Sequence, residues 1–424
     1  MKSVSLASPR HLAGTVKPTL LDGLARRAVL KQLRGLKRGA LVLSDGGHKH
    51  RFGSAEEIGG TAPVRIEVRD PRFWSDIAFG GSIGAGEAWM HGYWTCSDLV
   101  ALVRLVLRNR EVLDGMESGT ARLSAPLQKW FHRTNRNSHQ GARRNIAAHY
   151  DLGNAFFGLW LDESLMYSCA VFERPDMSLH EAQVARLERI CRKLDLRPSD
   201  RVVEIGTGWG GFALHAARHH GCHVTTTTIS REQYELACER VRAAGLEHRI
   251  TVLCEDFRDL EGQYDKLVSI EMIEAIDSPL YEPFFRTCAN LLRPDGVMLL
   301  QAITIADQRY VESLQSVDFI QRYIFPGGRL PSSAVMTRTA AEHTDLRLLH
   351  LEDIGLHYAK TLRCWRENFF ERIAEVRALG YSETFIRMWE YYLCYCEGAF
   401  LERAISDVQI VFARPEFLGP SPEI

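Results

Sequence analysis

Apolar residues change their spacing along the chain, and this pattern predicts most of its elements. From residue 201 onward, short apolar runs alternate with longer segments in which apolar residues recur at helical spacing. Continuous short runs are typical of parallel strands buried on both faces. The pattern therefore predicts a doubly wound α/β sheet. Its strands are expected at 202–205, 224–229, 250–254, 266–270 and 296–303, with a last strand at 407–413 that closes the sheet.

Helical spacing also appears before and between these strands, at 179–194, 231–244 and 281–292. Ser178 and Glu181, three residues apart, form a capping box for the first of these helices. The N-terminal part predicts a small α+β domain, with helices at 20–38 and 99–107, strands at 40–43 and 64–68, and close turns in the glycine-dense stretch 79–94. The expected domains are a lipid- or membrane-associating domain at 1–115, a linker at 116–145 and a catalytic domain at 146–424.

A glycine-rich turn follows the strand 202–205. The pattern Glu-x-Gly-x-Gly-x-Gly places Glu204 just before Gly206, Gly208 and Gly210, and a helix begins near Phe212. Glycine lets the backbone turn sharply and approach a ligand closely. Such a turn suits NAD, S-adenosylmethionine (SAM) or no ligand at all. The next strand ends in threonines and offers no acid for the adenosine ribose of NAD, which favours SAM.

Composition limits the partners and the cell compartment that we expect for this protein. A net charge of −1 gives no bulk signal for a nucleic-acid partner, and the ten cysteines contain no C-x-x-C pair. We therefore expect reduced thiols, no metal and a cytoplasmic protein. No signal-peptide core is seen, and no run approaches the ~18 apolar residues of a membrane span. The basic helical segment 20–38 either lies on an anionic bilayer or packs within its domain.

Several motifs together resemble the cyclopropane-fatty-acyl-phospholipid synthase family of SAM-dependent methyltransferases. The resemblance covers nearly the whole chain, and a plain methyltransferase would share only the glycine turn. The motifs are HYDLGN at 149–154, Tyr167-Ser168-Cys169, the glycine turn, Thr228-Ile229-Ser230 with Gln233, YIFPGG at 323–328 and VFAR at 411–414.

The resemblance implies a class I SAM-dependent methyltransferase fold and methylene transfer to double bonds of unsaturated acyl chains in phospholipids. It also implies a homodimer that works at the inner membrane surface from the cytoplasm. The expected SAM pocket, including crevice residues that the strand ends place nearby, comprises Tyr167, Ser168, Glu204, Gly206, Gly208, Gly210, Thr228, Ile229, Gln233, Asp256 and Phe257.

A bicarbonate ion is the base that the resemblance implies, held by Cys169, Glu274, Ile303 and Tyr358. Many bacterial members have His-x-Ile where this chain has Gln301-Ala302-Ile303, so the chain looks more like the plant-type branch and its bacterial relatives. Because strand side chains alternate in direction, Gln301 and Ile303 should point the same way. We predict that Gln301 and Glu274 both reach the anion.

The chemistry accounts for these residue types. Methyl transfer from SAM to an alkene leaves a carbocation, so the pocket must exclude water. Aromatic faces stabilise cations, and Trp209, Tyr167, Tyr150 and Tyr358 are candidates. Glu274 would hold the base or act as the base, and the Cys169 thiol is expected to be packed. The alternatives are a methyl-branched or methylene product, a small-molecule N-methyltransferase, and a lipid-binding protein without catalysis.

Overall fold

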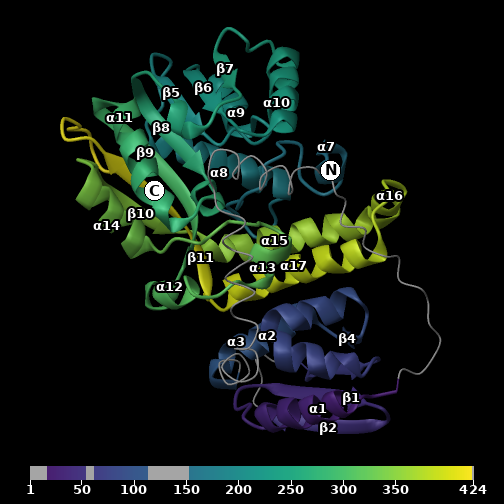
Figure 1. Ribbon diagram of the computed structural model, residues 1–424. Helices are drawn as coiled ribbons and strands as arrows, with labels where there is room; N and C mark the ends of the chain where they lie inside the picture. Colours follow the sequence, from purple (N-terminus) through teal and green to yellow (C-terminus); the bar gives the residue numbers. More distant parts are fainter. Residues whose placement is uncertain (1–16, 54–61, 113–151, 423–424) are drawn as a thin grey trace. The chain divides into compact units, whose positions relative to one another are not determined.

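The computed structural model describes residues 17–53, 62–112 and 152–422, and these form two compact units (Figure 1). The first unit combines the N-terminal residues with 316–320 and 372–402, and the second contains the rest. The expected catalytic domain, 146–424, therefore included a C-terminal helical segment, 372–402, that belongs to the first unit. The expected linker, 116–145, lies outside the described residues.

A four-stranded sheet in the order β2-β1-β3-β4 forms the base of the first unit. The polar edge strand β2 has no apolar run that would predict it. Helices pack on this sheet and on one another, and α17 contacts both α2 and α3. The elements are α1 (Leu20–Leu33), β1 (Ala40–Asp45), β2 (His48–Gly53), β3 (Val64–Val68), α2 (Arg72–Met90), β4 (Trp94–Cys96), α3 (Leu99–Arg108), α16 (Ile373–Ala378) and α17 (Glu383–Leu401).

The glycine-dense stretch 79–94 is mainly helical, so the expectation of close turns was wrong. Helix α2 is interrupted only at Gly81, where φ is 55°. Position 86 of this helix is glycine because a Cβ there would come within 2.4 Å of the Phe319 ring. Gly81 thus allows a kink in α2, and Gly86 allows close packing against Phe319.

The second unit is built on a seven-stranded sheet in the order β10-β11-β9-β8-β5-β6-β7. The expected α/β sheet is confirmed, and the successive neighbours β9, β8, β5, β6 and β7 pair in parallel. The strands are β5 (Arg201–Ile205), β6 (His223–Thr227), β7 (Ile250–Leu253), β8 (Tyr264–Ile270), β9 (Leu292–Ile305), β10 (Arg347–Asp353) and β11 (Ile405–Ala413).

The last strand does not close the sheet at an edge. β11 runs antiparallel between β9 and β10, with Gln301 opposite Gln409, and β10 forms the edge. β10 was not predicted, because its residues are mostly half-buried or exposed and give no apolar run. The position of β11 brings Asp407 and Gln409 beside the centre of the sheet.

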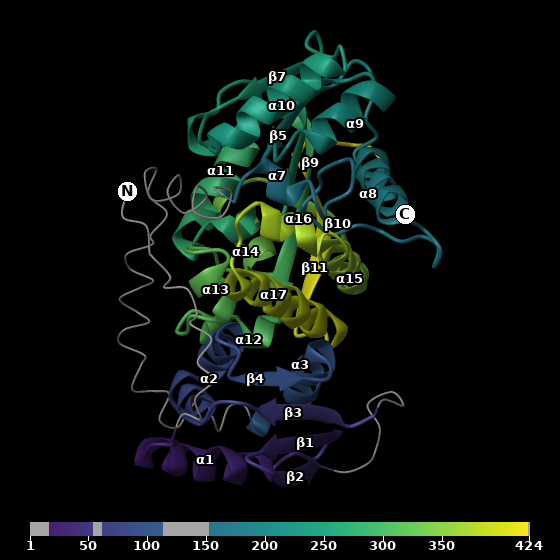
Figure 2. The ribbon, with the colours of Figure 1, turned by 90° about the vertical axis from the view of Figure 1, so that its right-hand side faces the viewer.

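Helices cover both faces of this sheet, as Figure 2 shows with the sheet nearly edge-on. One apolar core joins α8 and α9 to alternate strand residues such as Val202, and the other joins α11 and α14 to their neighbours such as Val203. The α-helices of the second unit are α7 (Asn154–Phe157), α8 (Leu179–Lys193), α9 (Gly211–His219), α10 (Arg231–Ala243), α11 (Tyr281–Leu291), α12 (Asp307–Ser313), α14 (Ser333–His343) and α15 (Gly355–Glu371). Helix α13 (Phe319–Tyr323) begins in the first unit and ends in the second.

The predicted capping box of α8 is present, with Ser178 accepting from the Glu181 N–H and Glu181 accepting from the Ser178 N–H. Both cores leave the carboxyl ends of β5, β6, β7 and β8 at one edge of the sheet. In sheets of this kind ligands bind at that edge. No helix in the described part of the chain is long and apolar enough to cross a membrane.

Candidate active site

The glycine turn after β5 exposes backbone to a ligand. Gly206, Gly208 and Gly210 have φ values of 104°, 51° and 83°, which side chains rarely adopt. The N–H groups of Gly206 and Thr207 donate to the Thr227 carbonyl, at 3.0 Å each, which ties the turn to β6. A Cβ added at Gly208 would meet nothing within 4 Å. The turn therefore has room beside it, and its residues fit SAM.

Glu204 lies beneath the turn rather than in the open crevice. Its carboxylate is 1% exposed and accepts a hydrogen bond of 2.6 Å from the Thr226 hydroxyl. The Thr226 hydroxyl is also 2.7 Å from that of Thr207, within the turn. Burial raises the pKa of Glu204 to about 8. This placement gives Glu204 a part in fixing the turn.

The ends of β6 and β7 carry the next group of expected SAM residues. The Thr228 hydroxyl donates to the Gln233 side chain at 2.8 Å, and Ile229 beside it is half-buried. Asp256 accepts two hydrogen bonds of 2.7 Å from the Arg258 guanidinium, and the Phe257 ring packs on α11. All of these residues lie at the same edge of the sheet as the glycine turn.

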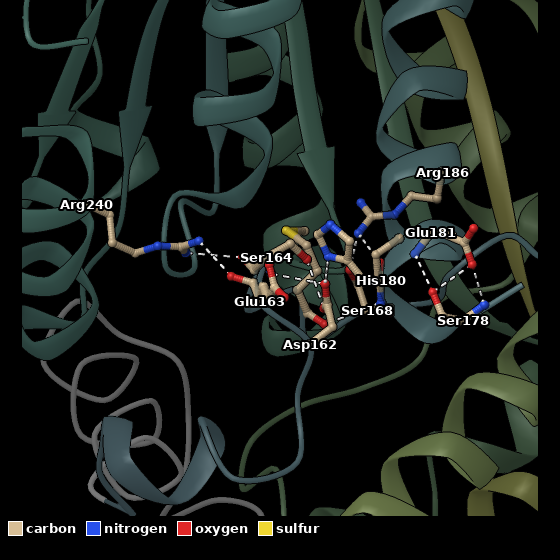
Figure 3. A network of polar contacts seen from close by, with 11 residues as sticks. Asp162, Glu163, Ser164, Ser168, Ser178, His180, Glu181, Arg186 and Arg240 are labelled. Carbon is tan, nitrogen blue, oxygen red and sulfur yellow. Dashed lines mark hydrogen bonds and ion pairs between the residues drawn. The ribbon is translucent and has the colours of Figure 1, made fainter. Parts of the chain in front are cut away.

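The loop 162–168 is held to two helices (Figure 3). From α10, Arg240 donates to the carbonyls of Ser164 and Glu163. From α8, His180 bonds Asp162 at 2.9 Å, and the buried guanidinium of Arg186 donates to the Ser168 hydroxyl at 2.9 Å. These contacts fix the backbone that leads into Tyr167 and Cys169.

Aromatic rings surround Tyr167. Its ring centroid lies 5.2 Å from that of Trp365, 5.4 Å from Trp160 and 5.5 Å from Phe157. The Tyr358 ring is 5.9 Å from Trp365, which connects this group to α15. We call these five residues the aromatic cluster. Trp209 of the glycine turn packs against it, with its ring 5.0 Å from Phe157.

A carboxylate that was not among the predicted site residues lies beside the aromatic cluster. Glu271, directly after β8, accepts hydrogen bonds at Oε1 from the Cys169 N–H and from Gln301 Nε2, both at 2.8 Å. At Oε2 it accepts from the Tyr358 hydroxyl at 2.5 Å. The structure therefore does bring Cys169, Gln301 and Tyr358 together, around Glu271.

Glu274 takes a different place. One of its oxygens accepts from the Ile303 N–H, and the other has no hydrogen-bond partner. Burial, with the charge of Glu271 second, raises the pKa of Glu274 well above its usual range. Glu274 and Ile303 are thus paired with each other, whereas Gln301 bonds Glu271 and, at 2.9 Å, Asp407.

Sequence reasoning missed Glu271 although a signal was present. It is the first residue after β8, whereas Glu274 comes four residues after the strand. The first position after a parallel strand is the more direct indication of a place at the ligand edge. The thiol of Cys169 is packed as expected, because the side chain is fully buried and only its backbone reaches Glu271. Tyr150 lies outside the described residues.

The family model for mycolic acid cyclopropane synthetase matches residues 137–410. The chain belongs to this family. It is a SAM-dependent methyltransferase of the class I fold, and its family is one of SAM-dependent lipid modification. Membership agrees with the glycine turn and with the acid-free end of β6.

Named relatives cover most of the chain. It is 37% identical over 366 residues to the cyclopropane-fatty-acyl-phospholipid synthase of Escherichia coli, covering 84% of this chain and 90% of that protein. It is 39% identical over 328 residues to the tuberculostearic acid methyltransferase UfaA1 of Mycobacterium tuberculosis, covering 76% of each.

Solved structures agree with the fold. The cyclopropane synthase MmaA2 from Mycobacterium tuberculosis is similar with a TM-score of 0.60 and 31% identity, covering 64% of this chain and 98% of that one. The mycolic acid cyclopropane synthase CmaA1, complexed with SAH and CTAB, has the same values. Coclaurine N-methyltransferase, at 21% identity and a TM-score of 0.60, shares the fold.

Proposed function

We propose that this protein transfers a one-carbon unit from SAM to the double bond of unsaturated acyl chains in phospholipids and forms cyclopropane fatty acids. The observation that carries the proposal is the aromatic cluster, which stands beside a hydrogen-bonded carboxylate at the ligand edge of the sheet. The similarity to the Escherichia coli synthase supports this substrate class.

The aromatic cluster suits a reaction that develops positive charge on an acyl chain. SAM supplies an electrophilic methyl group, and its transfer to an alkene carbon leaves the neighbouring carbon cationic. Trp160, Phe157 and Trp365 are buried, so water is kept from a cation that it would trap as an alcohol. Ring faces stabilise a nearby cation by about 0.5–2 kcal/mol each.

Alignment of the two reactants is the other contribution of the protein. The glycine turn and the Thr228–Gln233 pair hold SAM, and Arg186 and Arg240 fix the loop that carries Tyr167. Holding reactants in register can supply roughly 7–11 kcal/mol of the barrier. The enzyme therefore needs no nucleophile of its own, which fits the packed thiol of Cys169.

Lipid analysis tests the proposal. The full-length protein should be expressed in cells that contain unsaturated phospholipids, with methyl-labelled methionine in the medium. We expect a labelled one-carbon mass gain in the acyl chains and cyclopropane protons in the NMR spectrum. Gly208→Val serves as the inactive control, because it fills the space beside the turn. A methylated amine with no lipid change, or no labelled product, would refute the assignment.

A methyl-branched alkene or a methylene chain is the second candidate product. The same cation can lose a proton from a neighbouring chain carbon, or a hydride can shift to it from the methylated carbon before the added methyl group loses a proton. The 39% identity with a tuberculostearic acid methyltransferase supports it. The same experiment distinguishes the two, because this product shows the labelled mass gain without ring protons.

Engagement of an anionic membrane surface follows from a phospholipid substrate. In α1, Leu20, Leu21 and Leu24 are 92%, 52% and 62% exposed, and Arg27 and Lys31 are exposed on the same helix. Such a helix can place leucines among acyl chains and basic groups among headgroups. The opposite face of α1, with Ala25 and Val29, is buried in its own unit.

Vesicle binding tests this role. The full-length protein should bind anionic vesicles more tightly than neutral ones and should release them as salt rises, because charges are screened beyond about 10 Å at 0.1 M. Leu20→Ser with Leu24→Ser should weaken binding, whereas Leu379→Ser, also about half exposed (48%) in the same unit, should not. Equal loss in both variants would exclude α1 as the contact. Light scattering of the same samples tests the expected homodimer.

A further inference from the structure

Glu271 occupies the place where the family resemblance expects bicarbonate. Three of the groups expected around that ion donate to the Glu271 carboxylate instead: the Cys169 N–H, the Gln301 amide and the Tyr358 hydroxyl. A second anion in the same position would lack these donors and would meet a buried negative charge. The residues present therefore do not fit bicarbonate.

The backbone holds Glu271 in this position at a cost. Its φ is 49°, a left-handed conformation in which a residue with a Cβ is uncommon and strained by roughly 1–2 kcal/mol. Its N–H donates to the Gln301 carbonyl at 2.8 Å, which continues the pairing of β8 with β9. Strain of this kind persists where the surroundings fix it, and it concentrates at functional sites.

The donor amide of Gln301 is oriented by a chain of hydrogen bonds. Lys193, which can only donate, bonds the Gln409 side-chain oxygen at 2.8 Å. The Gln409 amide must then donate, and it does so to the Gln301 oxygen at 3.1 Å. The Gln301 NH₂ group is left to face Glu271 and Asp407. Glutamine at this position thus suits a carboxylate neighbour.

Neighbouring groups oppose the effect of burial on the pKa of Glu271. Burial raises the pKa of both Glu271 and Asp407, and the charge of Glu271 raises that of Asp407 further. Hydrogen bonds from Tyr358 and Cys169, and the buried guanidinium of Arg186, act in the opposite direction on Glu271. These contacts favour the carboxylate form of Glu271, which is the form that can accept a proton.

Glu271 also lies beside both proposed binding sites. The next residue, Met272, lies so close to the glycine turn that a Cβ at Gly206 would be 3.3 Å from its side chain. On the other side, Glu271 accepts a hydrogen bond from the Tyr358 hydroxyl, and Tyr358 belongs to the aromatic cluster. The carboxylate thus stands between the SAM turn and the proposed acyl site.

We infer that Glu271 is the general base of the reaction and replaces bicarbonate in this protein. The inference rests on the proposed function. The SAM methyl carbon bonds one alkene carbon, the C–S bond electrons remain on sulfur, and the other alkene carbon becomes cationic. Glu271 takes a proton from the added methyl group, and the released C–H electron pair forms the second C–C bond. The neutral Glu271 acid returns its proton to water after product leaves.

Turnover is measured with methyl-labelled SAM and unsaturated phospholipid vesicles, in buffer freed of carbon dioxide or supplemented with bicarbonate. We expect the wild-type protein to be indifferent to bicarbonate. Glu271→Gln should lose about 10²-fold or more in turnover, the scale of general-base catalysis, while SAM affinity by calorimetry is kept. A wild-type enzyme that needs bicarbonate, or a Glu271→Gln enzyme within a few-fold of wild type, would overturn the inference.

Glu271→Gly separates a missing base from a damaged fold. Glycine tolerates the φ of 49° and frees the three donors, so this variant should regain at least tenfold activity when bicarbonate is added. Equal activity without bicarbonate would contradict the inference. Binding of ¹³C-bicarbonate, measured by NMR without lipid, gives a readout besides activity: the glycine variant should bind it and the wild type should not. Bicarbonate binding by the wild type would overturn the inference, whereas absent lipid product in the wild type refutes the proposed function instead.

Discussion

Replacing Glu204 with glutamine should stabilise the protein at neutral pH. The side chain is 1% exposed in the sheet, and burial raises its pKa from 4.5 to about 8. The folded state therefore holds a proton that the unfolded state has released above about pH 5. Glutamine resembles the protonated acid in shape, can still accept from the Thr226 hydroxyl and never ionises.

The sign follows from linkage. A group whose pKa is higher in the folded state contributes stability below its unfolded pKa, and this contribution is lost as pH rises toward the folded pKa. Each pH unit between the two values corresponds to about 1.4 kcal/mol. At pH 7 the raised pKa of Glu204 thus lowers the free energy of unfolding by about 3 kcal/mol relative to its value at pH 4.5. At pH 8 this loss reaches about 5 kcal/mol.

Urea unfolding of the wild type and of Glu204→Gln, at half-unit steps from pH 5 to 8, measures this difference. The free energies of unfolding should diverge steadily as pH rises, with the glutamine variant more stable. Glu239→Gln, on the exposed face of α10, is the matched control and should follow the wild type. Parallel curves for wild type and Glu204→Gln would refute a raised pKa at Glu204.

Three further changes test other parts of the structure. Gly208→Val should lower SAM affinity by more than tenfold in calorimetry, because a branched side chain would fill the open space beside the turn at a φ of 51°; unchanged affinity would remove SAM from this edge. Gly86→Leu should cost about 1–3 kcal/mol of stability by overpacking against Phe319, and Phe319→Ala should partly restore it in thermal unfolding. Glu352→Gln should cost about 3–5 kcal/mol at pH 7, because it leaves the buried Lys193 ammonium without its carboxylate. Bonds from Arg189 and Lys193 outweigh burial and lower the pKa of Glu352 to about 2, so this difference should shrink as pH falls from about 4.5 toward 2, and a loss that is constant with pH would contradict it.

The sequence by itself determined the elements whose cause is local. Apolar runs predicted β5 to β9, because a strand buried on both faces needs apolar side chains on both. Glycines at Gly206 and Gly208 predicted the turn, since their φ values are rare for other residues. The box of Ser178 and Glu181 predicted the start of α8, because both hydrogen bonds form within three residues.

Only the tertiary structure decided the features whose partners are distant in the chain. Position 86 of helix α2 needs glycine because the Phe319 ring comes close to it. Strand β11 lies inside the sheet because β10 pairs with its other edge. Distant partners also decide which of Glu271 and Glu274 occupies the centre of the site. Both follow β8, but the backbone N–H of Cys169 and the side chains of Gln301 and Tyr358 converge on Glu271 from positions at least 30 residues away. Spacing along a sequence cannot show such convergence, because it is produced by the packing of three separate elements against the end of one strand.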